Sequence, residues 1–315
     1  MLEKKIDIAK KTIQKNIDFF KCPLCGTPFG FDEDSGGMPG TPSPTNSLKC
    51  QNNHSYDISK KGYINLFNGY TKIVKTYDKK LFSARKKISD AGLYGKLCEK
   101  LYEIINNIDH KSILDAGCGC GNLTVDIFEN TGKNLTFAVD LSKDGIDFAA
   151  GSYCEDNILW IVGNLNNLPV ADNKIDIILN IMSPANYAEF IRILKPGGVL
   201  LKVMPDADYL KELRHFIYKE NDKNEYSNKD VLSNLAENMT ISDIIDVNYT
   251  HKVLSENIPD LFEMTPLTAN IDEREKIKDE LIAKCVGDGV PDFPNGFENN
   301  FEVTLAFKIA VCGKG

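Results

Sequence analysis

The chain has 315 residues, of which 42% are hydrophobic and 26% are charged, as in ordinary globular proteins, and this length allows one large domain with a smaller companion. No apolar run reaches the roughly 18 residues of a membrane helix, and the N-terminus lacks the apolar core and cleavage site of a secretory signal. We therefore expect a cytoplasmic protein with no membrane partner. The net charge of −8 argues against nucleic acid as a partner of the chain as a whole.

The chain begins with a segment of helical periodicity. Apolar residues recur at steps of three and four between Ile6 and Ile17, which predicts an amphipathic helix within residues 1–20. A cysteine- and turn-rich segment follows over residues 21–59. Its Gly, Pro, Ser and Thr residues between positions 35 and 47 predict a flexible loop.

Four residues of this segment have the spacing of zinc ligands, a C-x2-C step followed by a C-x3-H step: Cys22, Cys25, Cys50 and His54. Zinc prefers four sulfur or nitrogen ligands in a tetrahedron, and two short turns can supply them. A closed set of four predicts a structural Zn²⁺ site; the alternative is coincidental cysteines. The total of nine cysteines is odd and argues against a disulfide framework, so we expect the others to be buried or incidental.

Basic residues concentrate between positions 60 and 100, where 11 of them stand against 3 acidic ones and alternate with Tyr and Phe. Such a pattern suits a nucleic-acid strand, with phosphates outside and bases stacked on aromatic rings. A solvated helix face with buried aromatic residues explains it equally well. The candidate RNA-binding residues are Lys79, Lys80, Arg85, Lys86 and Lys87.

Strand-like and helical segments alternate from about Gly92 onward. The expected strands are SILDAG (112–117), LTFAVD (135–140), ILWIV (158–162), IDIILNI (175–181) and GVLLKVM (198–204). IIDVNYTHKVLS and FEVTLAFKIA suggest two more, with a helix around 271–286 between them. This alternation predicts an α/β fold, a doubly wound parallel sheet with helices on both faces.

A glycine-rich loop follows the first of these strands. Asp115 to Gly121 reads D-x-G-x-G-x-G, and glycines allow the backbone to approach a ligand closely. Asp140 ends the second strand, where its carboxylate can accept hydrogen bonds from ribose hydroxyls. The loop resembles motif I of the class I S-adenosylmethionine (SAM)-dependent methyltransferases. A dehydrogenase or a ligand-free loop is the alternative.

The zinc-ligand pattern and the glycine loop together resemble the large-subunit ribosomal RNA guanine-N1 methyltransferases, the RlmA family. The resemblance covers roughly residues 20–270 and is carried by CPLC…CxxxH, YDISKKGYINLF, ARKKxxDAGLY, DAGCGCG, PDADYLKELRxxIY and MTP (264–266). It implies SAM as methyl donor, a zinc ribbon that grips an rRNA hairpin and a Rossmann-like catalytic domain. The implied donor contacts are Tyr94, Asp115, Gly117, Gly119, Cys120, Gly121, Asp140, Leu141, Asn164 and Leu165.

This reading divides the chain into four parts. They are a helical extension (1–20), a zinc-binding RNA-recognition domain (21–66), a basic linker (67–91) and the methyltransferase domain (92–315). Two residues depart from the family pattern, since Cys120 stands where an acidic residue is usual and Tyr209 where bacterial members carry His. The N-terminal extension, the long loop between the ligand pairs and the acidic C-terminal tail are additions.

Methylation of guanine N1 requires loss of its proton, donors to the charge that develops at O6, and a base that is unpaired or flipped out. Segment 180–186, after the fourth strand, is where this fold holds its acceptor, and Asn180, Ser183 and Asn186 are the candidate substrate ligands. A helix cap at Asn186 and a turn at Ser183 are the alternatives. The segment has no Asp, Glu or His, so no catalytic base is assigned.

The expected partner is 23S rRNA or a precursor of the large ribosomal subunit, and a homodimer is compatible with the uneven charge. Two other functions remain open. One is a SAM-dependent small-molecule methyltransferase whose zinc module serves stability alone. The other is a non-catalytic SAM-binding protein that binds rRNA.

Overall fold

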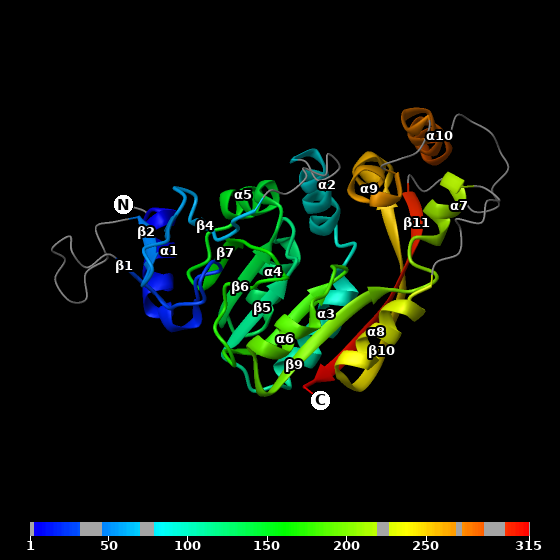
Figure 1. Cartoon of the computed structure of the whole chain (residues 1–315). Coiled ribbons are helices and arrows are strands. Elements are labelled where there is room, and N and C mark those ends of the chain that lie inside the picture. Colours follow the sequence, from blue (N-terminus) through cyan, green and yellow to red (C-terminus); the bar gives the residue numbers. More distant parts are fainter. Residues whose placement is uncertain are drawn as a thin grey trace.

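The computed structural model describes residues 3–31, 46–69, 79–218, 227–268, 273–286 and 300–314. Its centre is an eight-stranded sheet of order β10-β11-β9-β8-β5-β6-β7-β4 (Figure 1). The strands are β4 (Tyr63–Asn65), β5 (Ser112–Ala116), β6 (Leu135–Asp140), β7 (Ile158–Val162), β8 (Ile175–Ile181), β9 (Leu194–Pro205), β10 (Thr240–Leu254) and β11 (Asn300–Gly313). Neighbours from β9 to β4 are parallel, whereas β11 is antiparallel to both β9 and β10. The predicted α/β sheet is confirmed, and β4 is an edge strand that the sequence analysis did not predict.

Helices cover both faces of the sheet. They are α1 (Lys5–Lys15), α2 (Lys79–Asp90), α3 (Gly95–Asn106), α4 (Asn122–Asn130), α5 (Lys143–Ser152), α6 (Tyr187–Ile193), α7 (Lys211–Tyr218), α8 (Lys229–Asn238), α9 (Ile258–Met264) and α10 (Arg274–Val286). Successive strand residues point to opposite faces, so Leu114 packs in the core cluster that contains α1 and α6 residues. Its neighbour Ile113 packs in the cluster of α3 and α9. Both faces of β5 and β7 are therefore buried.

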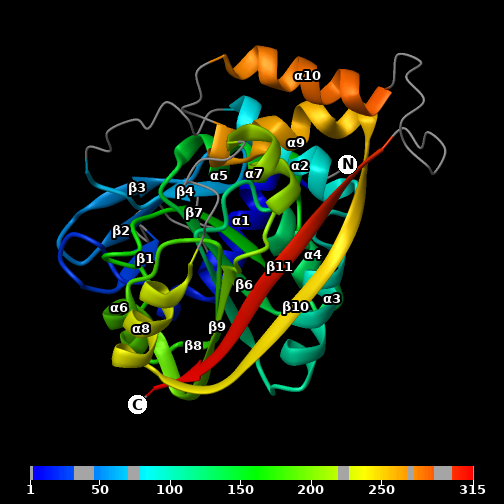
Figure 2. The same ribbon diagram turned by 90° about the vertical axis from the view of Figure 1, so that its right-hand side faces the viewer.

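The two C-terminal strands form a long antiparallel pair at one edge of the sheet. Figure 2 shows β10 and β11 side by side along their length, with α9 and α10 at one end of the pair. The short 3₁₀ segments η4 (Ser255–Asn257) and η5 (Pro266–Thr268) flank α9. The helix predicted around 271–286 is thus present as α10, and α9 is a further helix that brings residues 258–268 beside the sheet.

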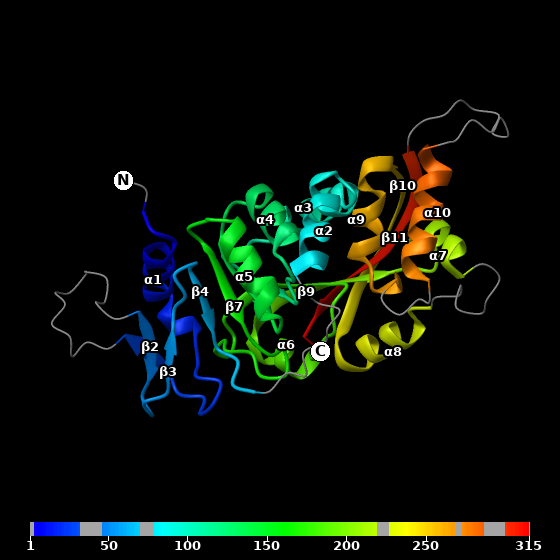
Figure 3. The same ribbon diagram turned by 90° about the horizontal axis from the view of Figure 1, so that it is seen from above.

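The N-terminal part is a small module attached to the opposite edge. Its strands β1 (Phe29–Phe31), β2 (Ser47–Cys50) and β3 (Ser55–Asp57) form an antiparallel sheet, and η1 (Ile17–Phe19) follows α1. Seen from above, α1, β2 and β3 lie beside β4, which pairs with β7 (Figure 3).

Polar contacts fix this module to the larger domain. Lys5 Nζ donates to the carbonyls of Ala150, Gly151 and Tyr153 at 2.6–2.9 Å, where α5 ends. An ammonium group is favourable there because the C-terminal carbonyls of a helix carry partial negative charge. Lys61 pairs with Asp147 of α5 at 2.6 Å. These contacts and β4 connect the module to the sheet directly.

The segment that we expected to be a linker, 67–91, contains helix α2 in its second half, and its residues 70–78 lie outside the described residues. Of the loop expected between 35 and 47, residues 35–45 lie outside the described residues as well. Within the described ranges, no helix has the length and apolar character needed to span a membrane.

Candidate functional site

The four predicted zinc ligands converge in the N-terminal module. The Sγ atoms of Cys22 and Cys50 lie 3.5 and 3.4 Å from Nδ1 of His54, and Cys25 Sγ lies 3.6 Å from Cys50 Sγ. All four ligand atoms lie within 4.8 Å of one another. A tetrahedral zinc ion with Zn–S bonds of about 2.3 Å places its ligand atoms about 3.5–3.8 Å apart, so this donor set fits Zn²⁺.

Neighbouring hydroxyl groups orient the thiols. Thr27 Oγ1 lies 3.1 Å from Cys25 Sγ, and this hydrogen bond is the main reason that the pKa of Cys25 falls to about 5. The thiolate that zinc requires is therefore favoured. On the other side, the Tyr56 hydroxyl lies 3.6 Å from Cys22 Sγ and accepts a hydrogen bond from Asn68. Such outer contacts hold metal ligands in place, and the closed donor set indicates a structural site.

The glycine loop connects β5 to α4 at the carboxyl end of the parallel strands. Gly117, Gly119 and Gly121 all have positive φ, of 89°, 58° and 76°. A Cβ at Gly117 would lie 1.9 Å from Ser183 Oγ, and one at Gly121 would lie 2.3 Å from the Trp160 ring. Gly117 therefore allows the acceptor segment to approach, whereas Gly121 allows α4 to pack on β7.

The buried carboxylate of Asp115 and the partly buried carboxylate of Asp140 support this loop. Asp115 accepts a 2.6 Å hydrogen bond from Thr124, and Asp140 accepts bonds from the backbone N–H groups of Gly119 and Ser142 at 2.8 and 2.7 Å. Burial raises the pKa of both, that of Asp115 to about 7, although the Thr124 bond opposes the rise. A cation bound beside the loop would shift Asp115 toward its ionised form.

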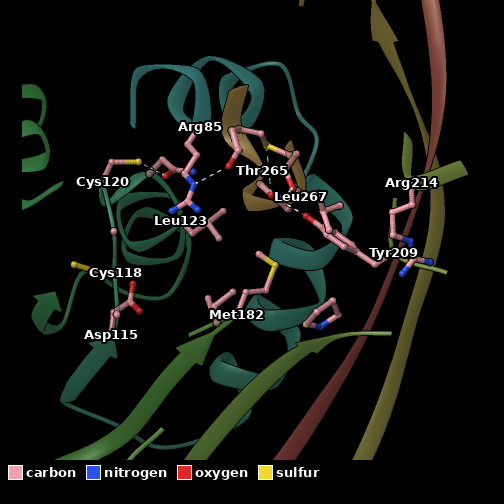
Figure 4. A pocket seen from close by; sticks show the side chains of 17 residues that line it. Arg85, Asp115, Cys118, Cys120, Leu123, Met182, Tyr209, Arg214, Thr265 and Leu267 are labelled. Carbon is pink, nitrogen blue, oxygen red and sulfur yellow. Dashed lines mark hydrogen bonds between the residues drawn. The ribbon is translucent and has the colours of Figure 1, made fainter. Parts of the chain in front are cut away.

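A cavity of about 330 Å³ opens above the glycine loop. Figure 4 shows Asp115, Cys118 and Cys120 on one side of it and Tyr209 and Arg214 on the other. The cavity is lined by five of the ten predicted donor residues, Tyr94, Asp115, Gly117, Gly119 and Cys120. Residues to which the sequence analysis gave no role complete the lining: Cys118, Asn122, Leu123, Ile181, Met182, Pro205, Tyr209, Arg214, Met264, Thr265 and Leu267.

The other predicted donor residues lie beside this cavity. Asp140 ends β6 and Leu141 follows it, and Asn164 and Leu165 follow β7, so these residues lie at the ends of the next two strands of the sheet. A ligand longer than the cavity could extend across these ends in the order β5, β6, β7. Gly121 has the packing role described above.

Helix α2 carries all five candidate RNA-binding residues, and most of them contact other parts of the chain. Lys80 pairs with Glu263 and Lys87 with Asp260 of α9, both at 3.1 Å, and Lys86 pairs with Asp90 of α2 itself. Lys79 is exposed.

Arg85, the remaining member of this set, lines the cavity, and its Nε donates to the Met264 carbonyl at 3.2 Å (Figure 4). A Cβ on Gly119 would lie 3.9 Å from Arg85 Nη1, so the guanidinium lies over the glycine loop. From the sequence, Arg85 was predicted to bind RNA and not to line the cavity, although it lies in ARKKxxDAGLY, one of the segments that carry the family resemblance.

The predicted substrate ligands have different environments. Asn180 is 0% exposed, and both of its amide hydrogens are used, in bonds to the carbonyls of Ala116 and Pro184. The side chain is therefore enclosed and its amide hydrogens are occupied within the protein, which argues against a direct contact of Asn180 with the substrate. Asn186 caps α6, since its side-chain oxygen accepts from Glu189 N, as the alternative reading held. Ser183 lies against Gly117 at the boundary between the two loops.

Ile181 and Met182 are the residues of this segment that line the cavity, and the φ of Met182, +47°, lies in the left-handed region. Nothing in the sequence indicates this conformation. By contrast, Arg214 and Met264 belong to PDADYLKELRxxIY and MTP, two of the segments that carry the family resemblance. These two segments could therefore have been predicted, from the resemblance, to contribute to the cavity.

Comparison with known proteins supports the family resemblance that was noted from the sequence. A family model described as the RlmA N-terminal region matches residues 20–72, and a methyltransferase-domain model matches residues 113–198. A putative 23S rRNA (guanine-N1)-methyltransferase of Bacillus subtilis is 36% identical over 267 residues, which are 81% of this chain and 89% of the relative. The 23S rRNA (guanine(748)-N1)-methyltransferase of Streptomyces fradiae is 30% identical over 64% of this chain and 69% of its own length. The chain therefore belongs to the 23S rRNA (guanine-N1)-methyltransferase family, with the zinc ribbon and SAM-dependent fold predicted from its sequence.

Proposed function

We propose that this protein transfers the methyl group of SAM to N1 of a guanine in 23S rRNA. The observation that carries the proposal is the cavity, which joins the glycine loop to the segment after β8 in a chain that also has the zinc module. One cavity can thus hold the donor's methyl group and an acceptor base together. The names of the relatives supply the substrate class and the atom that is methylated.

The donor end of the cavity suits the amino-acid group of SAM, whose sulfonium provides an already activated methyl group. Arg85 is placed to bind its carboxylate, and Asp115 is placed to attract its ammonium from the opposite side of the glycine loop. Asp140 would bind the ribose, and Asn164 with Leu165 would lie near the adenine. Arg85 and Asp115 therefore match the charged amino-acid group of SAM, and the residues at the ends of β6 and β7 match its nucleoside.

The other end suits a flat base that has left its helix. Met182, Pro205 and Leu267 provide apolar walls. The hydroxyls of Tyr94 and Tyr209 lie 3.2 Å apart, and burial raises the pKa of both, so they stay neutral hydrogen-bond donors at physiological pH. Such donors, together with Arg214, can stabilise charge that develops at guanine O6. Ser183 would act at the rim of this end.

Within the cavity lining, Asp115 is the one carboxylate and histidine is absent. Because Asp115 lies at the donor end, we name no side chain as the base that accepts the guanine N1 proton.

RNA binding would involve the zinc module and the exposed face of α2, in line with the division into 1–20, 21–66, 67–91 and 92–315. Because Lys80, Lys86 and Lys87 already pair with carboxylates, we expect Lys79 and the zinc module to contribute more to RNA affinity than these three lysines. A ribosomal substrate also fits the predicted cytoplasmic location. A homodimer and a subunit precursor as substrate remain predictions.

The test is methyl transfer from labelled SAM to unmodified 23S rRNA, followed by reverse transcription across the product. N1 methylation blocks base pairing, so we expect label incorporation and one strong stop at a guanine. Label without a stop would mean another atom or base. Donor binding without any transfer to rRNA or subunits would instead favour a small-molecule substrate or a non-catalytic role.

A further inference from the structure

A buried lysine lies beneath the acceptor segment. Lys202 of β9 is 4% exposed, and its Nζ donates to Asn180 Oδ1 at 2.5 Å and to the Ser183 carbonyl at 2.6 Å. In the described part of the chain, no carboxylate lies within ion-pair distance of it. Burial lowers the pKa of Lys202 to about 8. A buried ammonium without a counter-ion costs stability, and such groups beside a cavity are often functional.

The partners of Lys202 connect both sides of the reaction. Asn180 donates to the Ala116 carbonyl at 2.8 Å and to the Pro184 carbonyl at 3.0 Å. Ala116 is the residue immediately before the glycine loop, and Pro184 belongs to the acceptor segment. One ammonium and one amide thus join the base of the donor loop to the acceptor segment.

The same segment is tightly constrained where it meets the cavity. Ser183 Oγ lies so close to Gly117 that a Cβ there would be 1.9 Å away. Met182 has φ of +47°, and its N–H donates to the Val203 carbonyl at 3.0 Å. A left-handed non-glycine residue persists only where its surroundings hold it. The bond from Lys202 to the Ser183 carbonyl, one residue further on, is such a restraint.

We propose that Lys202 is a positioning residue for methyl transfer, which holds the acceptor segment at a fixed place relative to the glycine loop through Asn180 and the Ser183 carbonyl. The inference rests on the proposed function for its reaction. Transfer requires the acceptor atom, the methyl carbon and sulfur in line, and a displacement of about 1 Å can reduce a rate about 100-fold. Lys202 is not among the residues that line the cavity, so we expect its effect to fall on the transfer step and not on binding.

Two variants test this inference. Lys202→Met removes the ammonium, and Asn180→Leu with Lys202→Met replaces both buried polar groups by apolar ones of similar size, which is often tolerated in a core. Lys195→Met is the matched control, because Lys195 lies on the same strand but pairs with Asp176. Each protein is compared with wild type by SAM affinity, affinity for a 23S rRNA fragment, thermal midpoint and single-turnover methylation rate.

We expect both affinities within about threefold of wild type and a single-turnover rate at least tenfold lower in the two Lys202 variants, with the control unchanged. A folded double variant with the wild-type rate overturns the inference. Parallel loss of SAM affinity and rate, or failure of both variants to fold, shows a general structural role and also overturns it. Failure of the proposed function is distinct, because wild type itself would then bind SAM without methylating rRNA.

Discussion

Replacing Asp115 by Asn should stabilise the protein, and increasingly so as the pH rises. Asp115 is 3% exposed, and burial raises its pKa to about 7, whereas an unfolded chain ionises Asp at about 3.9. Between these values the folded state binds more protons than the unfolded state, so stability falls as the pH rises through this window. Asn is neutral and keeps an oxygen to accept the Thr124 hydrogen bond.

The magnitude follows from the two pKa values. The gain of Asp115→Asn over wild type should grow from between about 1 and 2 kcal/mol at pH 5 to about 4 kcal/mol at pH 8. Urea unfolding at pH 5, 6, 7 and 8 measures it, with fluorescence of the single tryptophan, Trp160 in β7, as the probe. Asp109→Asn, at an exposed carboxylate, is the control. Parallel stability curves for wild type and Asp115→Asn from pH 5 to 8 would refute the reasoning.

The same variant should lose affinity for the methyl donor. SAM carries a sulfonium and an ammonium, and both favour the ionised form of Asp115. Wild-type affinity should therefore rise as the pH increases through about 7, and calorimetry in different buffers should show proton release on binding. Asp115→Asn should bind SAM more weakly and lack both effects. Equal proton release in the two proteins would assign the titration to another group.

Three further predictions concern the other parts of the site. Arg85→Lys should weaken SAM binding by about tenfold or more, because one point charge replaces a planar donor pair; unchanged affinity in calorimetry would place the donor carboxylate elsewhere. We expect elemental analysis to find one zinc per chain in the wild type, and Cys50→Ser, or a strong chelator, should abolish this binding and make the N-terminal module sensitive to protease; retention of zinc by Cys50→Ser would contradict the ligand set. Asn186→Ala should cost about 1 kcal/mol of stability through loss of the α6 cap without slowing methyl transfer, and a slow but fully stable variant would restore Asn186 as a substrate ligand.

Periodic and spaced features could be predicted from sequence because their cause is local. Strands such as ILWIV are apolar over their whole length, and the zinc ligands follow from two short chelating turns. Strand β4 has three residues, too few for a periodic pattern, and its place depends on pairing with β7. Arg85 lies in a run of basic residues, and only tertiary packing separates the side chain over the glycine loop from the lysines that pair on the surface.

Asn180 shows why the acceptor segment was harder to interpret. A polar residue at the end of a strand suits both a substrate ligand and a buried structural amide, and the difference is made by Lys202, a residue 22 positions away. The lysine was visible as a single charge within the apolar stretch GVLLKVM, at a position that a buried strand normally fills with an apolar residue. A charge that interrupts a predicted core strand therefore indicates a buried polar partner, even when the partner cannot be named from sequence.

Asp115 and Lys202 together indicate how this active site is organised. Each is a buried ionisable group whose charged form is disfavoured by burial, as the raised pKa of one and the lowered pKa of the other show. A neutral residue at either place would favour the stability of the fold. Asp115 lies at the start of the glycine loop, and Lys202 lies against the acceptor segment. Asn180 links Lys202 to Ala116, the last residue of β5 and the neighbour of Asp115. Asp115 lines the cavity and Lys202 bonds to the segment that lines its other side. Because both groups oppose the stability of the fold there, function explains their presence better than folding does.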